Sequence, residues 1–238
     1  MSTIPPAIAL LSQLLKQKGH TTDIFDTTFY EFEDDLTLED ADKGPEKSLQ
    51  VRPILDVDDD NLHFKKNVID PSMDLRKKIT EFKPDLLAVS CSETTFHRGL
   101  RLISKTRDMG IKNIFGGVFP TFAPHLVMNF NDVDMACVGE GENALIDLCK
   151  KIETKKQFSN ITNVWIKKNN KIVEKNKISD PVDINKNPII DTTLFEENRL
   201  YRPMAGRVYK MFPVETIRGC PFTCTFCNSP DQMRLYKD

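Results

Sequence analysis

The sequence lacks the segments that would place a protein in or across a membrane. It has no run of about eighteen apolar residues, and its N-terminus has no charged region followed by an apolar core. It also lacks a charge excess, since 33 Lys and Arg stand against 35 Asp and Glu. A balanced charge gives no electrostatic footprint for nucleic acid. We therefore expect a cytoplasmic protein without a membrane span or a nucleic-acid partner.

Cysteine is scarce and unevenly placed. Six cysteines occur in the 238 residues, and three of them stand singly in apolar segments, as small buried hydrophobic side chains typically do: Cys91, Cys137 and Cys149. The other three form the run Cys220-x-x-x-Cys224-x-x-Cys227. Structural zinc would want a fourth ligand, and no further cysteine or nearby histidine follows. A disulfide framework is disfavoured, because the chain has no secretory signal and exceeds the size of disulfide-dense domains.

Three thiolates on one short loop suit a [4Fe–4S] cluster with one iron left open. An electron-transfer cluster usually takes four cysteines, one per iron. An open iron can bind the amino and carboxylate groups of S-adenosylmethionine (SAM) and pass an electron to its sulfonium, which releases a 5′-deoxyadenosyl radical. The stretch from Glu215 to Pro230 resembles the start of a radical SAM barrel. This resemblance implies Cys220, Cys224 and Cys227 as cluster ligands, and an external electron donor of flavodoxin or ferredoxin type.

The region before this run alternates helices with strands. A helix behind Pro5-Pro6 ends at Lys18-Gly19, and a short strand is expected over 21–25. Residues 31 to about 66 are acidic and predict a surface insertion, in which only 49–57 has strand character. Helices are then expected over 72–82, 96–107 and 142–152, with a further helix after the second of three strands at 85–91, 113–115 and 134–138. This order predicts an α/β fold with a doubly wound, Rossmann-like parallel sheet of flavodoxin type, in which strand 85–91 is buried on both faces.

Two glycine-containing loops follow strands of this sheet. Residues 116–124 read Gly-Gly-Val-Phe-Pro-Thr-Phe-Ala-Pro, and residues 139–142 read Gly-Glu-Gly-Glu. Both lie at carboxyl ends of strands, where open α/β sheets bind their ligands. Glycine there lets the backbone approach a large flat ligand. Taken alone, each loop is also what an ordinary turn between a strand and a helix would look like.

Together and in this order, the two loops resemble the B12-binding domain of cobalamin-dependent radical SAM proteins, from about Pro5 to Ile152. The resemblance implies that the corrin ring of a cobalamin lies over 92–95, 116–121 and 139–142. The implied contacts are Ser92, Thr94, Gly116, Gly117, Pro120, Thr121, Gly139, Glu140, Gly141 and Glu142.

The histidines do not supply the cobalt ligand known from methionine-synthase-like proteins. Their D-x-H-x-x-G motif is absent, and none of the four histidines stands in such a context: His20, His63, His97 and His125. His125 follows Pro124, where the family often has Glu, and we expect it to be a surface or loop histidine.

The chain then leads toward the cysteine run. Strands over 162–168 and 171–175 are separated by Asn169-Asn170, which predicts a β-hairpin with Trp165 packed on its covered face. The stretch 180–195 resembles the family's linker, and 212–217 is expected to be the first strand of a radical SAM (β/α) barrel. The expected domains are a B12-binding Rossmann-like domain at 1–153, a hairpin and linker at 154–211, and the start of a radical SAM domain at 212–238.

We expect the chain to be a fragment. A complete barrel needs on the order of a hundred or more residues beyond Cys227. The family also has a strand before the Pro5-Pro6 helix that is absent here. That strand is central in a sheet of order 2-1-3-4-5, so its absence should leave a gap.

The resemblance implies the N-terminal part of a cobalamin-dependent radical SAM enzyme, with a methyltransferase as the leading reaction type. Its cofactors would be a [4Fe–4S] cluster, SAM and cobalamin, and its small-molecule or peptide substrate is not encoded in these residues. Two alternatives stay open. One is a radical SAM enzyme without cobalamin, similar to methylthiotransferases, whose corresponding domain usually carries three further ligand cysteines. The other is an inert fragment that only binds cobalamin.

Overall fold

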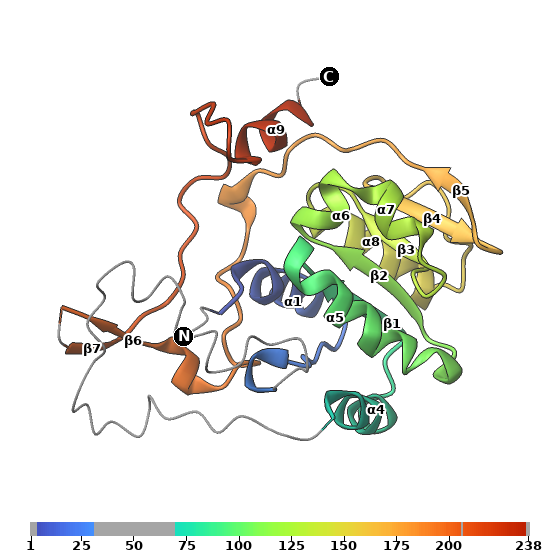
Figure 1. Cartoon of the computed structure of the whole chain (residues 1–238), viewed down its shortest axis with the longest axis horizontal. Helices are drawn as coiled ribbons and strands as arrows, with labels where there is room; N and C mark the ends of the chain where they lie inside the picture. Colours follow the sequence, from blue (N-terminus) through green and yellow to red (C-terminus); the bar gives the residue numbers. More distant parts are fainter. Residues whose placement is uncertain (1–3, 31–69, 206, 237–238) are drawn as a thin grey trace.

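The computed structural model describes residues 4–30, 70–205 and 207–236. The acidic insertion predicted at about 31–66, with its strand at 49–57, lies outside the described residues. The chain builds an α/β sheet domain, and a long extended segment then leads to a small hairpin and a terminal helix (Figure 1). No helix within the described ranges is long and apolar enough to cross a membrane.

A mostly parallel sheet forms the centre of the described chain. Its five strands lie in the order β1-β2-β3-β4-β5. β1 (Leu86–Ser90), β2 (Lys112–Gly116) and β3 (Met135–Cys137) run parallel, with Leu86 opposite Lys112 and Ser90 opposite Gly116. The prediction of three parallel strands in a Rossmann-like α/β fold is confirmed.

The predicted hairpin is also present, and it belongs to the same sheet. β4 (Val164–Lys168) pairs antiparallel with β3, and β5 (Lys171–Lys175) pairs antiparallel with β4. Asn169 and Asn170 have φ of 51° and 58°, as the hairpin turn requires. Trp165 is half-buried and packs against the core cluster of Phe96 and Phe115.

Helices cover both faces of the sheet because its central strands are apolar on both sides. Along β2, Ile114 points into one core cluster and Phe115 into the other, since neighbouring strand residues face opposite ways. α8 (Glu142–Glu153) packs Leu145 and Leu148 into the cluster of Ile114. The other cluster takes residues from α5 (Glu93–Ser104), α6 (Val118–Phe122) and α7 (Pro124–Asn129).

The helix ends follow local sequence signals. α1 (Pro6–Gln17) begins at a proline and ends where Gly19 has a φ of +89°. The N–H of His20 then donates to the carbonyl of Leu15 at 3.1 Å, which closes the helix in the way that Lys18-Gly19 predicts. α4 (Pro71–Phe82) begins after Asp70, whose carboxylate accepts a hydrogen bond from the Ser72 N–H at 2.9 Å.

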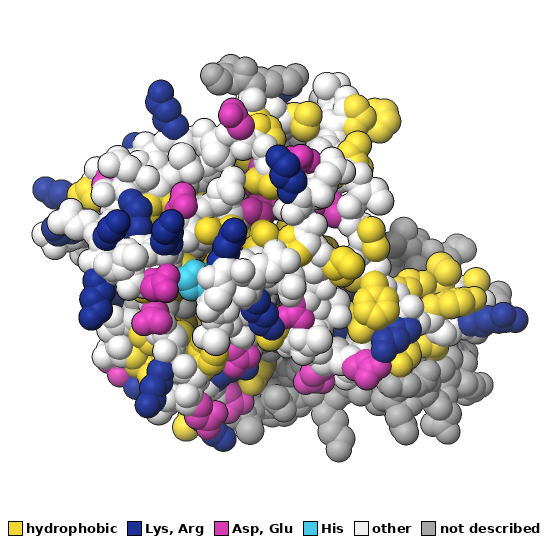
Figure 2. Space-filling model, turned by 180° about the vertical axis from the view of Figure 1, so that it is seen from behind, with side chains coloured by type: hydrophobic (Ala, Val, Ile, Leu, Met, Phe, Trp, Pro, Cys, Tyr) yellow, Lys and Arg dark blue, Asp and Glu magenta, His cyan; other side chains and the backbone are white. Residues whose placement is uncertain are grey.

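Two predicted strands and one predicted burial pattern are wrong. Residues 21–25 and 212–217 form no strand, and neither segment belongs to the two described sheets. The side chains of Phe212, Val214 and Ile217 are instead exposed. Figure 2 shows hydrophobic side chains gathered in patches on one face of the molecule. β1 is not buried on both faces. It is an edge strand of the described sheet, and a cavity runs along it.

The segment after the sheet returns to α1 before it reaches the cysteines. Phe195 and Leu200 pack on Ile4 and Ala9, and Lys16 pairs with Asp191 at 2.5 Å. Next comes a hairpin that the sequence had not predicted, of β6 (Tyr201–Met204) and β7 (Arg207–Lys210). The cysteine loop and α9 (Ser229–Arg234) follow, beyond the carboxyl edge of the sheet (Figure 1).

Candidate functional site

A large cavity opens at the carboxyl ends of the parallel strands and continues along β1. Its volume is about 1720 Å³. Pockets for small ligands usually span roughly 300–1,000 Å³, so this cavity suits a larger one. The lining comes from the loop after β2, the turn after β3, and Arg218 and Gly219 in the stem of the cysteine loop.

Most of the predicted cobalamin contacts lie in this cavity. Seven line it: Gly116, Gly117, Thr121, Gly139, Glu140, Gly141 and Glu142. Ser92, Thr94 and Pro120 are described but do not line it. Ser92 begins α5, where its N–H donates to Thr95 Oγ1 at 2.9 Å, and Thr95 is the residue of this cap that reaches the cavity.

Thr121 joins the two loops that follow β2 and β3. Its side chain is buried, and its hydroxyl donates to the Gly117 carbonyl at 2.8 Å. The same oxygen accepts a hydrogen bond from the Gly139 N–H at 3.1 Å. Because both bonds stay within the protein, this hydroxyl fixes the spacing of the loops, and their exposed backbone is left to face the cavity.

Two glycines in these loops cannot be replaced without backbone strain and a shift of neighbouring atoms. Gly117 has a φ of +105°, and a Cβ there would lie 2.5 Å from the Cys91 carbonyl oxygen. Gly139 has a φ of +88°, and a Cβ there would lie 2.7 Å from the hydroxyl of Tyr236. The sequence predicts close approach of a ligand at these glycines. The structure shows that protein atoms also approach them closely.

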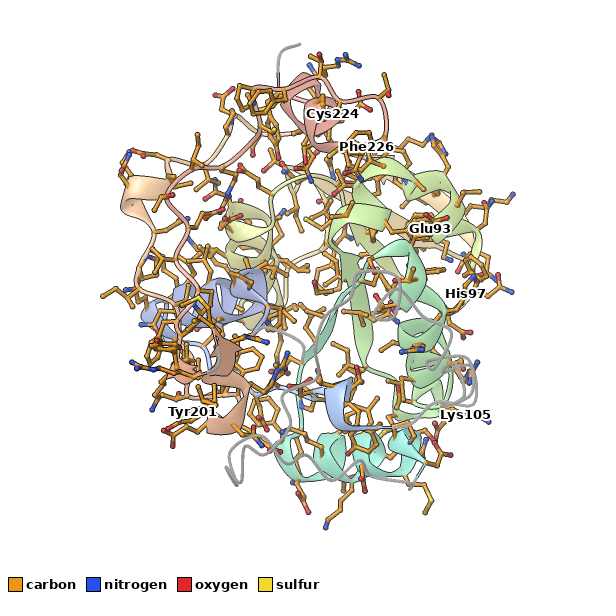
Figure 3. The ribbon with its side chains drawn as sticks, turned by 60° about the vertical axis from the view of Figure 1, so that its left-hand side comes forward. Glu93, His97, Lys105, Tyr201, Cys224 and Phe226 are labelled. Atoms are coloured by element: carbon orange, nitrogen blue, oxygen red, sulfur yellow. The ribbon has the colours of Figure 1, made fainter. Side chains whose placement is uncertain are left out.

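The cysteine loop is exposed, in contrast to the loops of the sheet. Figure 3 shows Cys224 and Phe226 near one end of the molecule, next to the carboxyl edge of the sheet. Cys220 is half-buried, while Cys224 and Cys227 are exposed. Hydrogen bonds from Ser229 hold the pKa of Cys227 below its usual value. Three free thiols on one loop fit the donor set of a [4Fe–4S] cluster.

These thiols are not gathered around one point. Among the described residues, no three His, Cys, Asp or Glu side chains are arranged to hold a metal ion. The other cysteines are of a different kind. Cys91 and Cys137 are buried, and burial raises the pKa of each thiol to about 12. Cys149 is half-buried, and burial raises its pKa to about 11. The prediction of buried thiols holds for Cys91 and Cys137.

The stem of the cysteine loop meets the turn after β3 in a cluster of charges. Arg218 Nη1 donates to Glu140 Oε1 at 2.8 Å and to Glu142 Oε1 at 2.7 Å. Its Nε and Nη2 donate to Glu215 at 3.0 and 2.8 Å. The hydrogen bonds to Glu215, together with those to Glu140 and Glu142, raise the pKa of Arg218 above its usual value, so the guanidinium stays charged. No motif in the sequence predicts this cluster.

The described histidines play different parts around the site. His97 and His125 do not line the cavity. His125 lies in α7, and its ring meets the Trp165 ring edge-on, with 4.7 Å between the ring centroids. His20 does line the cavity, at the turn that follows α1. His63 lies outside the described residues.

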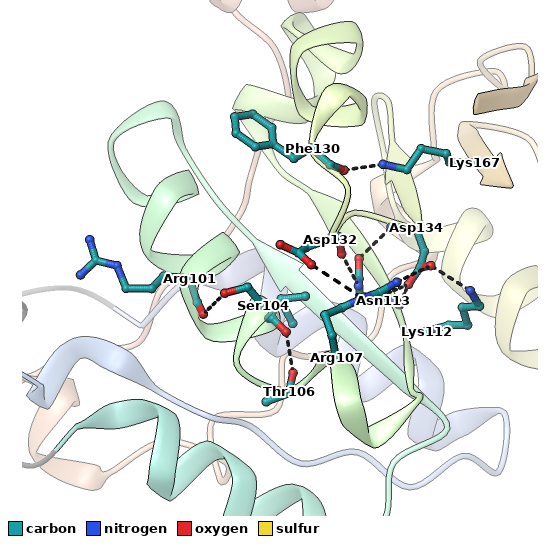
Figure 4. Close-up of polar contacts among 11 residues, drawn as sticks. Arg101, Ser104, Thr106, Arg107, Lys112, Asn113, Phe130, Asp132, Asp134 and Lys167 are labelled. Carbon is teal, nitrogen blue, oxygen red and sulfur yellow. Dashed lines mark hydrogen bonds and ion pairs between the residues drawn. The ribbon is translucent and has the colours of Figure 1, made fainter. Parts of the chain in front are cut away.

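The amino ends of β2 and β3 are tied together at the opposite edge of the sheet. Asp134 receives Arg107 Nη1 at 2.7 Å, Lys112 Nζ at 2.8 Å and the Asn113 N–H at 3.1 Å (Figure 4). Burial would raise the pKa of Asp134, but the hydrogen bonds from Arg107, Lys112 and Asn113 lower it overall. This network anchors the strands whose other ends carry the candidate site.

Comparison with known proteins places a domain on the region before the cysteine loop. Residues 52–148 match the family described as B12 binding domain. The anaerobic magnesium-protoporphyrin IX monomethyl ester cyclase of Rubrivivax gelatinosus is 26% identical over 172 residues, which are 69% of this chain and 30% of the relative. An uncharacterized methyltransferase of Pyrococcus horikoshii is 26% identical over 161 residues, 66% of this chain and 34% of the relative. The chain thus spans about a third of the length of these relatives.

Solved structures share the fold. The radical SAM methyltransferase TsrM of Kitasatospora setae, with cobalamin and a [4Fe–4S] cluster bound, has a TM-score of 0.52 and 16% identity, over 72% of this chain and 28% of its own. OxsB, a cobalamin-dependent SAM radical enzyme with aqua-cobalamin and SAM bound, has a TM-score of 0.52 and 14% identity, over 78% of this chain and 21% of its own. At these identities the similarity is one of fold.

Proposed function

This chain contains a B12-binding domain, and from that premise we propose that it forms the cobalamin-binding and cluster-binding part of a cobalamin-dependent radical SAM enzyme. Methyl transfer is the proposed reaction type, because a solved structure of the same fold and a curated relative are both methyltransferases. The cyclase among the relatives marks ring formation as the competing reaction type.

One observation carries the proposal. A single cavity is lined by the two loops of the sheet domain and by Arg218 and Gly219, which directly precede Cys220. A cobalamin at the carboxyl edge of the sheet and a cluster on the cysteine loop would therefore lie beside each other. This proximity is what a methyl donor and a source of substrate radicals require of each other.

The residues of this chain would hold the cofactors and orient them. When bound, the cobalamin supplies a carrier for the methyl group, and the [4Fe–4S] cluster supplies the electron that cleaves SAM. Thr121 holds the two loops at a fixed spacing, and the backbone of Gly116, Gly117 and Gly139 presents a surface free of side chains. The thiolates of Cys220, Cys224 and Cys227 would ligate three irons.

The positions of the described histidines favour a cobalt site without a histidine ligand. His97 and His125 do not line the cavity, and His20 reaches it only from the turn after α1. We infer that no histidine from a D-x-H-x-x-G motif ligates the cobalt. Backbone and side chains of the loops after β2 and β3 would hold the corrin.

Titration of the purified chain with hydroxocobalamin tests the first half of the proposal. A saturable shift of the visible corrin bands is expected, because the cavity would exchange the water around the cobalamin for protein contacts. If adding the chain leaves the corrin spectrum unchanged, the result favours a radical SAM enzyme without cobalamin. That alternative also needs ligands for a second cluster, and Cys91 and Cys137 are buried thiols with raised pKa values.

Anaerobic reconstitution with iron and sulfide tests the second half. The expected product has the broad visible absorption of a [4Fe–4S] cluster and, after reduction, an EPR signal that changes on addition of SAM. Absence of any cluster spectrum would overturn the radical SAM assignment. SAM cleavage by the isolated chain would distinguish a competent enzyme from a module that only binds cobalamin.

A further inference from the structure

The stem of the cysteine loop is fastened to the Gly139–Glu142 turn by residues far away in sequence. Arg218 bridges Glu140 and Glu142, which precede it by 78 and 76 positions. Its remaining donors hold Glu215 on its own segment. The guanidinium therefore ties two segments together.

Tyr236 adds a second fastening from the far side of the loop. Its hydroxyl accepts a hydrogen bond from the N–H of Glu140 at 2.8 Å, across 96 positions. It lies so close to Gly139 that a Cβ on that residue would come within 2.7 Å of it. Arg218 precedes the three cysteines and Tyr236 follows them, and both bind the same turn, 139–142.

The charges of this cluster depend on Arg218. The side chains of Glu140 and Glu142 are only 11% and 8% exposed, so water does little to screen their mutual repulsion. A single guanidinium between them supplies the compensating charge, and its fork geometry suits carboxylates. The second oxygen of Glu140 accepts the N–H of Val182 at 2.6 Å, which leaves that carboxylate little freedom to turn toward a ligand.

We propose that Arg218 and Tyr236 form a clasp that positions the cysteine loop against the cobalamin-binding edge of the sheet, with Glu140 and Glu142 as its anchors. This inference rests on the proposed function. Arg218 lies two residues before Cys220, so the clasp fixes where the first thiol stands relative to the cavity. The carboxylates of Glu140 and Glu142 bind Arg218, so the backbone of the turn is the part that would contact the corrin. Arg218 and Tyr236 are positioning residues.

Hydrogen exchange on the cofactor-free chain tests the clasp directly. In Arg218→Gln, exchange of the hydrogen-bonded amides of Gly139, Glu140 and α9 should rise about tenfold or more, while β2 and β3 exchange as in the wild type. The matched control is Arg234→Gln, which removes an exposed pair with Asp231 from the same C-terminal segment and should change exchange little. If the two variants behave alike, the clasp is refuted.

Two further variants separate loss of the clasp from simple misfolding. Arg218→Gln combined with Glu142→Gln should exchange more slowly than Arg218→Gln alone, because one of the uncompensated carboxylates is gone. Arg218→Lys should retain part of the protection, since it keeps the charge but loses the fork. Additive worsening in the double variant would contradict the proposed charge arrangement.

A cofactor readout links the clasp to the two sites. Arg218→Gln and Tyr236→Phe should each release iron to a chelator about five- to tenfold faster than wild type after reconstitution, while Arg234→Gln matches wild type. Hydroxocobalamin should slow iron release in the wild type and should do so less in Arg218→Gln. Failure of the wild type to bind either cofactor would overturn the proposed function, and the exchange experiment would still decide on the clasp.

Discussion

The two halves of the candidate site are organised in opposite ways. The loops after β2 and β3 are crosslinked by Thr121 and contain buried residues and glycines in close contact with neighbouring backbone and side chains. The cysteine loop has exposed thiols at Cys224 and Cys227, and Phe226 between them is 91% exposed. It is held at its two ends, by Arg218 and by Tyr236.

This contrast indicates two routes to a binding site. The half in the sheet domain is preorganised: its loops lose their conformational entropy when the sheet folds, so ligand binding does not have to order them. The cysteine half has its proposed cluster ligands on one exposed loop, and metal binding is coupled to folding in such loops. Variants in the first half should therefore change protein stability, and removal of the thiols in the second half should change only the cluster.

The largest effect is expected from removing the thiols. Replacing Cys220, Cys224 and Cys227 by alanine should abolish cluster formation, because no other described thiol is exposed. Thermal stability and hydroxocobalamin affinity should stay near the wild-type values. Iron and sulfide analysis with EPR measures the first effect. Cys149→Ala is the control and should keep its cluster. A cluster that persists in the triple variant would break the comparison.

The next effect is expected at Gly139. Gly139→Ala should destabilise the protein by about 3 kcal/mol, from backbone strain at positive φ together with a clash against Tyr236. The control is Gly110→Ala, which has a φ of +72° but nothing within 4 Å, and it should cost about 1 kcal/mol from strain alone. Denaturant unfolding measures both. Equal losses would show that the contact with Tyr236 is unimportant.

A smaller effect is expected at Thr121. Thr121→Val keeps the shape of the side chain but leaves the Gly139 N–H without its acceptor, at a cost of about 1–2 kcal/mol. Hydroxocobalamin should also bind more weakly, because the spacing of the two loops is no longer fixed. Thr154→Val, which removes an exposed helix-end hydrogen bond, is the control for loss of a hydroxyl. An unchanged affinity would mean that the loops keep their spacing without Thr121.

The smallest effect is expected from acid, at the opposite edge of the sheet. The pKa of Asp134 is lower in the folded chain than its usual value near 4, so its carboxylate stabilises the fold above that pH. This stabilisation should be lost as the pH falls below about 4 and through the lowered pKa. Asp134→Asn should lose it at neutral pH and show a flatter acid profile. A wild-type profile in the variant would exclude Asp134 as the anchoring carboxylate.

Features that depend on neighbouring residues in sequence were predictable, and features that depend on distant partners were not. The end of α1 at Gly19 and the turn at Asn169-Asn170 follow from local backbone preferences. The strands predicted over 21–25 and 212–217 are absent, because a strand needs a partner strand that an apolar pattern alone does not guarantee.

The candidate site divides along the same line. Its glycine loops and cysteines could be found as motifs. The contacts of Arg218 and Tyr236 with the turn after β3 span 76 to 96 positions, and no local pattern marks them. A charged residue just before a cysteine motif, with acidic residues in a glycine turn elsewhere, is a signal that could have suggested the pairing.

The distance between Glu140 and Arg218 also sets an order of events during synthesis. At about 5–20 residues per second, the 78 positions between them take about 4–16 s to translate. For that interval the turn after β3 exists on the ribosome with two carboxylates and no guanidinium. The loops that the sheet contributes to the cavity are therefore made before the residues that tie the cysteine loop to them, so the contacts of Arg218 and Tyr236 form last at this edge.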